Sequence, residues 1–188
     1  DFEWRNKNYY HGLYTRTQSY FDRSDLSSHG VPAKTHEKEL LAPFPEAVTP
    51  AILDGTYALP KSDASGRNRA SRRKALLLLK QAGYALKDGK LVNAKTGEPF
   101  AFEILAVSGG QQRLMLKFID ALRGLGIDAE LRIVDYAQYQ RRRQTYDFDM
   151  IQAFWYASLS PGNEQLFRWS SKSAETEGTF NYAGVKNP

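Results

Sequence analysis

The strongest constraint on the fold is the regular succession of helix and strand patterns between residues 70 and 155. Segments whose apolar residues recur every three or four positions alternate there with segments whose apolar residues recur every second position. The pattern predicts helices over residues 70–82, 111–123 and 136–145, a hairpin of residues 91–92 and 100–105 around a turn at 93–98, and strands over 127–135 and 148–155. Because this order packs helices onto strands, the sequence predicts an α/β fold with a mixed sheet.

The first third of the chain lacks this regularity. A helix is expected over residues 1–11, and residues 14–21 are β-prone. Residues 22–68 form a long Pro-rich irregular segment, interrupted by a short helix over Thr35–Leu41 with Thr35 as its N-cap. Irregular segments of that length are uncommon unless they pack on something or carry function. The length of 188 residues fits one domain that contains this excursion.

Composition excludes several classes of protein. A chain of 188 residues with 41% hydrophobic residues is long enough to bury a core and too apolar to be disordered. It contains no cysteine, which excludes a thiol nucleophile, a disulfide framework and a cysteine zinc site. Its longest aliphatic run, residues 76–79, is far shorter than the roughly 18 apolar residues of a transmembrane helix. The net charge of +5 raises the question of an anionic partner.

The positive charge is concentrated in two clusters. Residues 66–74 contain five cations and no acid, and Arg141, Arg142 and Arg143 are consecutive. The first cluster begins an expected helix, where cations oppose the macrodipole, so a solvated helix end is the simpler interpretation. The alternatives are an anionic ligand, contacts to a further part of the protein, and a basic nucleic-acid-binding module, for which no accompanying motif is present.

No residue pattern points to catalysis. The three histidines, His11, His29 and His36, lie in different contexts and lack the spacing of metal ligands. Asp147 and Asp149 are two positions apart on an expected strand, so their carboxylates would share a face. An acid–base pair there is the enzyme alternative, and carboxylates bonded to solvent or backbone are the simpler interpretation. We expect no enzyme, no metal site and no cofactor.

A candidate ligand site lies in residues 154–165, where an expected strand ends in adjacent aromatic residues and continues into a loop of small polar residues. Ligands of open α/β sheets bind at the carboxyl ends of the strands. Aromatic walls combined with a few polar groups suit an organic ligand. Trp155 is the central residue of this candidate site, and a tryptophan that only caps the core is the other interpretation.

Several segments resemble the extracellular solute-binding proteins of the peptide/nickel ABC-importer class, family 5. The segments are residues 76–84, 88–92 and 141–150 with the Trp155 loop. Three others resemble the Yej-type oligopeptide and microcin C binding proteins in particular, namely residues 14–21, 63–69 and 160–165. The resemblance runs in order through essentially the whole chain.

The resemblance implies a periplasmic-binding-protein type II-like lobe. Family members are much longer and close two lobes around a peptide, so the chain is expected to be most of the second lobe of a longer protein. The absence of an initiator methionine agrees with that expectation. The resemblance also implies a periplasmic location and an oligopeptide or peptide-like ligand. The implied protein partners are a membrane ABC permease and the missing first lobe, with no nucleic acid.

The resemblance further indicates which residues contact the ligand. Trp155 matches the family's loop tryptophan and is expected to stack on the ligand. The other expected ligand-binding residues are Arg16, Thr17, Gln18, Tyr156, Ser158, Asn163 and Tyr182. Dipeptide and oligopeptide binders carry an Asp after the tryptophan that pairs with the amino terminus of the peptide. Ala157 and Ser158 stand there in this chain, which implies a more permissive ligand.

Overall fold

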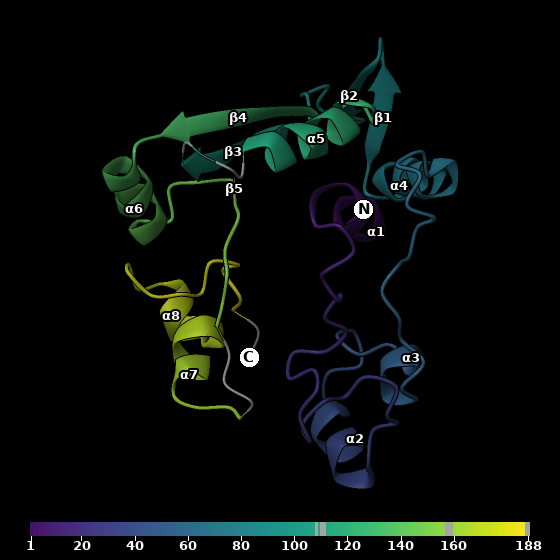
Figure 1. Ribbon diagram of the computed structural model, residues 1–188, viewed down its shortest axis with the longest axis vertical. Helices are drawn as coiled ribbons and strands as arrows, with labels where there is room; N and C mark the ends of the chain where they lie inside the picture. The colour runs from purple at the N-terminus through teal and green to yellow at the C-terminus, as the bar shows by residue number, and fades with distance from the viewer. Residues whose placement is uncertain (108, 110–111, 157–159, 187–188) are drawn as a thin grey trace. The chain divides into compact units, whose positions relative to one another are not determined.

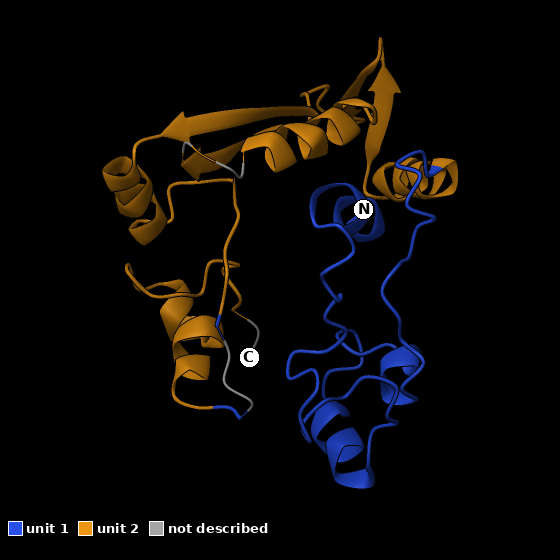
Figure 2. Cartoon of the chain, in the orientation of Figure 1, with its two compact units in different colours: residues 1–68, 156–161 blue, residues 69–155, 162–188 orange. Residues whose placement is uncertain are grey.

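The computed structural model describes the chain except residues 108, 110–111, 157–159 and 187–188. The chain divides into two compact units, shown in different colours in Figure 2. The first unit contains residues 1–68 and 156–161, and the second contains residues 69–155 and 162–188. The interpretation of the chain as a single lobe stays a prediction. Among the described residues, no helix is both long and apolar enough to cross a bilayer.

The second unit is built on a parallel sheet of three strands, in the order β4-β3-β5. The central strand is β3 (Ala101–Val107), which pairs along its whole length with β4 (Asp128–Val134). On its other side β3 pairs with β5 (Met150–Ile151). Helix α5 (Gln112–Arg123) follows β3 in the chain and α6 (Tyr136–Gln144) follows β4, as the crossover connections of parallel strands require (Figure 1).

The core lies between this sheet and α5. Ile104 on β3 and Ala129 on β4 are almost fully buried, and they contact Ile119, the one buried residue of α5. Because side chains alternate across a strand, the neighbours Glu103 and Glu130 point to the opposite face of the sheet. One face of the sheet is therefore apolar and covered, and the other carries charged groups.

The helices of this region are confirmed with small shifts at their ends. Helix α4 covers Arg69–Gln81, α5 covers Gln112–Arg123 and α6 covers Tyr136–Gln144. Strand β4 is also confirmed. The α/β fold class is confirmed as well, although the parallel and antiparallel pairs form separate sheets instead of one mixed sheet.

The predicted hairpin around residues 93–98 is confirmed only next to its turn, and β2 has a second, longer pairing that the sequence pattern did not indicate. Strand β2 (Lys90–Asn93) pairs antiparallel with β1 (Tyr84–Lys87), across the two-residue turn Asp88-Gly89. Both turn residues have positive φ, +50° and +78°, as a tight hairpin of this kind demands. Residues 91–93 also bond across the predicted turn to residues 98–100. The Asn93 N–H donates to the Glu98 oxygen and the Phe100 N–H to the Leu91 oxygen, both at 2.8 Å, on either side of a bridge between Val92 and Pro99.

Two further expectations fail at the end of the sheet. The strand predicted over residues 148–155 is only the two residues of β5, because pairing with β3 stops after Leu105 and Ile151. The segment after residue 160 contains two short helices that the sequence pattern did not indicate, α7 (Glu164–Trp169) and α8 (Ser171–Ala174). Both are too short to show a helical period of apolar residues.

The first unit contains α1 (Phe2–Tyr9), α2 (Thr35–Leu41) and α3 (Pro50–Leu53). Residues 14–21 form no strand, and at their start the backbone of Tyr14 bonds to the side chain of Asn6 through two hydrogen bonds of 2.7 and 3.0 Å. Helix α2 has the predicted bounds, but its N-cap is Lys34, whose N–H donates to Glu37 Oε2 at 2.6 Å.

The loop between α5 and β4 provides a test of this packing. Gly126 has φ +85°, and a Cβ there would lie 2.9 Å from Leu91 N and 3.0 Å from Gly89 O. We expect Gly126→Ala to lower the free energy of unfolding by about 2–4 kcal/mol in urea titrations, from backbone strain plus the steric conflict. Gly97→Ala is the matched control, with φ +77° and open space around it, and should cost about 1 kcal/mol. Equal losses would show that the close approach is unimportant.

Candidate functional site

The candidate site is a group of four rings in the second unit, Trp155, Trp169, Phe180 and Tyr182, here called the aromatic cluster. Trp155 follows β5, and its ring centroid lies 5.3 Å from that of Trp169 at the end of α7. The Tyr182 ring stacks on Trp155 at 6.2 Å with an interplanar angle of 11°. Phe180 contacts Tyr182 edge to face at 6.1 Å. Rings from three separate segments thus meet after the carboxyl end of β5.

Helix α6 contacts the same place through its side chains. The Arg143 guanidinium lies 5.7 Å from the centroid of the Tyr182 ring, in cation–π geometry. The Tyr139 hydroxyl donates a long hydrogen bond of 3.5 Å to the backbone oxygen of Gln152. Burial raises the pKa of both Tyr139 and Tyr182, and the positive charge of Arg143 opposes that rise. Both phenols are therefore held in their neutral form well into the alkaline range.

Two buried polar atoms of this segment have no hydrogen-bond partner in the described part of the chain. They are the indole Nε1 of Trp155, which is a donor, and the amide Oε1 of Gln152, which is an acceptor. By contrast, the indole of Trp169 donates to Gln165 Oε1 at 3.1 Å. A buried polar atom without a partner costs free energy, so such atoms are uncommon unless a ligand or water completes them. The segment after β5 therefore contains one buried donor and one buried acceptor whose hydrogen bonds are not made within the described residues.

The structure brings together two of the predicted site residues, Trp155 and Tyr182. Asn163 lies in the same unit, where it precedes the first residue of α7. Of the rest of the predicted set, Arg16, Thr17, Gln18 and Tyr156 belong to the first unit, and Ser158 is outside the described residues, as is Ala157. Sequence reasoning missed Trp169 and Arg143. The aromatic residues near position 167 and the arginine triplet were visible, but nothing in the sequence placed them beside Trp155.

Arg16 is already engaged within the first unit. Its guanidinium donates to the backbone oxygen of Pro60, lies 3.8 Å from the Glu3 carboxylate and sits 5.9 Å from the Phe2 ring centroid. The Gln18 backbone N–H is likewise bonded, at 3.2 Å to Asp22 Oδ2. The role of Arg16, Thr17 and Gln18 in ligand binding stays a prediction.

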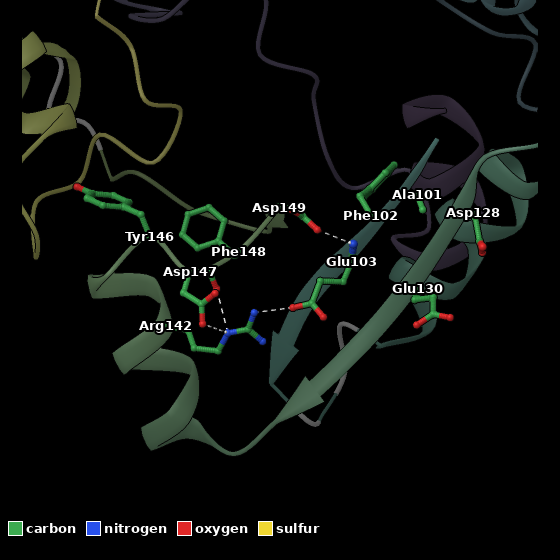
Figure 3. A pocket seen from close by; sticks show the side chains of 10 residues that line it. All are labelled: Ala101, Phe102, Glu103, Asp128, Glu130, Arg142, Tyr146, Asp147, Phe148 and Asp149. Atoms are coloured by element: carbon green, nitrogen blue, oxygen red, sulfur yellow. Dashed lines mark hydrogen bonds and ion pairs between the residues drawn. The ribbon is translucent and has the colours of Figure 1, made fainter. Parts of the chain in front are cut away.

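The two acids flanking Phe148 line a polar cavity of about 660 Å³ on the charged face of the sheet (Figure 3). Asp147 pairs with Arg142 at 2.9 Å, and Arg142 also bonds to Glu103 Oε1 at 2.6 Å. Asp149 Oδ2 accepts from the Glu103 backbone N–H at 3.0 Å. Each carboxylate thus has a separate partner: the Arg142 side chain for Asp147 and, as the simpler interpretation expected, a backbone N–H for Asp149. Within the described ranges, no group of three or more acids or histidines is placed to hold a metal.

Both cation clusters contribute to the fold. Arg142 and Arg143 point in different directions, one to the sheet and one to Tyr182. In the first cluster, Arg72 on α4 donates to the Gly124 carbonyl at the end of α5. A cation at that point complements the negative end of the α5 dipole, even though it opposes the dipole of its own helix. These contacts favour a structural use of the arginines over a nucleic-acid-binding surface.

The comparisons with known proteins identify the class to which the chain belongs. The sequence profile of the bacterial extracellular solute-binding proteins, family 5 (middle region), matches residues 1–177. The chain therefore belongs to this family, and the resemblance seen in the sequence is confirmed.

Two solved structures share the fold. One is the oligopeptide-binding protein AppA of Bacillus subtilis in complex with a nonapeptide, 26% identical, with a TM-score of 0.53 over 61% of this chain and 23% of that one. The other is a periplasmic oligopeptide-binding protein of Thermotoga maritima, 22% identical, with a TM-score of 0.53 over 62% of this chain and 23% of that one. The expected periplasmic-binding-protein type II-like fold is confirmed by these likenesses.

Relatives match the chain over its whole length. It is 50% identical to a Brucella melitensis protein named as a binding protein, and 43% identical to the peptidoglycan-binding protein YepA of Agrobacterium fabrum. It is 37% identical to a protein of Agrobacterium fabrum named "probable peptide-binding protein YejA". The chain spans 30% of the length of each of these relatives.

The contacts of Arg142 predict its contribution to stability. The Arg142 side chain is 18% exposed and bonds to two acids, whereas Arg132 is 64% exposed and lies 3.5 Å from Glu103. We expect Arg142→Met to lower the free energy of unfolding by about 1.5–3 kcal/mol, as for other hydrogen bonds between charged groups. Arg132→Met, the control, should change it by less than about 1 kcal/mol. Urea unfolding of the two variants measures this, and similar values for both would contradict the assignment.

The raised pKa of Tyr182 and Tyr139 predicts a loss of stability in alkaline solution. An unfolded tyrosine releases its proton near pH 10, whereas the buried phenols keep theirs to higher pH. The unfolded state is therefore favoured increasingly as the pH rises above about 10 and until the folded pKa is passed. Ultraviolet titration should show late-ionising tyrosines that Tyr182→Phe and Tyr139→Phe each reduce in number.

Arg143 provides the matched variant for that titration. Because its positive charge favours the phenolate, Arg143→Met should raise the pKa of Tyr182 further. A Tyr182 pKa that falls or stays unchanged in Arg143→Met would show that the guanidinium does not act on this ring.

Proposed function

We propose that the chain is part of the ligand-binding lobe of a periplasmic protein that captures oligopeptides or peptide-like compounds and delivers them to an ABC permease. The observation that carries the proposal is the aromatic cluster at the end of β5, with the unpaired Trp155 Nε1 at its centre. Membership of the family supports it. The names of YepA and YejA, and the nonapeptide bound to AppA, agree with a peptide ligand.

A peptide fits the groups that this site offers. Each peptide unit presents one carbonyl oxygen and one N–H, which complement the Trp155 donor and the Gln152 acceptor. The faces of the rings accept apolar side chains of different shapes, since aromatic surfaces contribute contact area without a fixed hydrogen-bond pattern. The site therefore recognises the backbone of the ligand more strictly than its side chains. In this proposal the protein binds its ligand without transforming it.

The proposal assigns closure and delivery to the rest of the protein. A second lobe closes over the ligand in a hinge motion, and the closed form docks on the permease in the membrane. The Ala157 and Ser158 positions, where an acid would pair with the amino terminus of a peptide, leave the ligand free to vary at that end.

Substitutions at Trp155 separate the contribution of its aromatic ring to peptide binding from that of its Nε1 hydrogen-bond donor. In the longest natural polypeptide that contains this chain, we expect Trp155→Ala to weaken binding of a synthetic nonapeptide and tripeptide at least about tenfold, equivalent to about 1.4 kcal/mol. Trp155→Phe keeps a ring and loses the Nε1 donor, so its loss should be intermediate. Phe154→Ala is the matched control, because Phe154 is the neighbouring aromatic residue and is 64% exposed. Calorimetric affinities that are equal in all four proteins would overturn the proposal.

The isolated chain provides a second test. Because it supplies only part of the groups that enclose a ligand, we expect the 188 residues alone to bind these peptides with a Kd of about 1 mM or weaker. Calorimetric titration of the isolated chain measures this. Micromolar binding would show that enclosure by a second lobe is not needed.

A further inference from the structure

Asn181 is the most completely buried polar residue near the aromatic cluster. Its side chain is 1% exposed, and every polar atom of its amide group is bonded. The amide nitrogen donates to the backbone oxygens of Ser170, at 3.1 Å, and Val185, at 2.9 Å. The amide oxygen accepts from the Val185 backbone N–H at 2.9 Å. The short asparagine side chain supplies two N–H donors and an oxygen acceptor, and all three are used here.

These hydrogen bonds join the two segments that hold the partners of Trp155. Ser170 directly follows Trp169, and Asn181 directly precedes Tyr182. The bonds to Val185 also close the loop in which Tyr182 lies. Trp169 and Tyr182 are the two rings that contact Trp155, at 5.3 and 6.2 Å. One amide group thus connects the backbone beside each of these rings.

We propose that Asn181 is a positioning residue for the ligand site, which sets the placement of Trp169 and Tyr182 against Trp155. The inference rests on the proposed function for its effect on ligand binding, and on the geometry alone for its effect on the rings. Asn181 itself is buried and acts through the two rings. Without the two N–H donors of Asn181, the loop at 181–185 is no longer bonded through this amide to Ser170. The Trp169 and Tyr182 rings are then no longer held in one fixed placement against Trp155.

A neighbouring network provides a matched control. Thr179 Oγ1 lies 2.6 Å from the backbone oxygen of Ser173 and 3.0 Å from that of Thr176, which share its single hydroxyl hydrogen, and it also contacts the hydroxyl of Tyr146. Thr179→Val removes these bonds from the same segment while keeping the shape of the side chain. It leaves the bonds of Asn181 to Ser170 and Val185 intact. If Asn181→Ala and Thr179→Val lower stability by similar amounts but only Asn181→Ala changes the placement of the rings, the effect is one of positioning and not of general destabilisation.

The first measurement needs no ligand. Two indoles as close as Trp155 and Trp169 couple their electronic transitions and give an exciton couplet in circular dichroism. We expect Trp155→Phe and Trp169→Phe to abolish the couplet, Asn181→Ala to reduce it at least about twofold, and Thr179→Val to preserve it. An unchanged couplet in a folded Asn181→Ala protein would overturn the inference, whatever the ligand proves to be.

The second measurement is a double-mutant cycle on peptide affinity, in the longest natural polypeptide that contains this chain. Asn181→Ala should weaken binding of the synthetic nonapeptide about two- to tenfold in the wild-type background and have little further effect in Trp155→Phe. Equal factors in the two backgrounds would show a general effect and contradict the positioning role. Asn181→Asp gives a further check, because its carboxyl group regains a donor only when protonated, so the couplet should recover in acid. Failure of all peptides to bind would contradict the proposed function and leave the dichroism result to decide the role of Asn181.

Discussion

The parallel pairing of β3 with its two neighbours determines which side chains of the three-stranded sheet face the core and which face the ion pairs on its other side. Because side chains alternate along β3, burial of Ile104 under α5 directs Glu103 to the opposite face. There Glu103 meets Arg142 on α6, and Arg142 in turn bonds to Asp147. Asp147 lies three residues before β5, so the ion-paired group fixes the entry of the strand that leads to Trp155. The apolar core and the aromatic cluster are thus connected through one alternating strand.

Sequence reasoning succeeded where the periodicity of a single segment decides the structure. The apolar positions of α5 and the alternation in β4 are properties of their own segments, and both elements were predicted close to their observed bounds. It failed where the outcome depends on a partner. Residues 14–21 have strand-forming side chains but pair with no strand, and the backbone of Tyr14 bonds to the Asn6 side chain instead; β5 ends where β3 no longer pairs with it. Neither partner is visible in the segment itself.

The same distinction holds for the candidate site. Trp155 and Tyr182 were both predicted, from the end of a strand and from the family resemblance, and they stack in the structure. Trp169 and Arg143 complete the arrangement from helices distant in the sequence, and only the folded chain brings them there. The arginines also show why the net charge was weak evidence for an anionic partner. Arg72, Arg142 and Arg143 each have a partner within the fold, so the excess of cations does not require an anionic ligand.

The candidate site has partners for only a small part of what the proposed peptide ligand presents. Every residue of a peptide has a carbonyl oxygen and, except for proline, an N–H that must keep a partner when it leaves water. The segment after β5 offers one unpaired donor and one unpaired acceptor among the described residues. The aromatic cluster adds contact area but no further directional groups, since the indole of Trp169 is already bonded to Gln165. A ligand longer than one peptide unit therefore needs partners from outside this cluster. That requirement agrees with a chain that spans 30% of the length of its relatives, and it is the reason to expect weak binding by the chain alone.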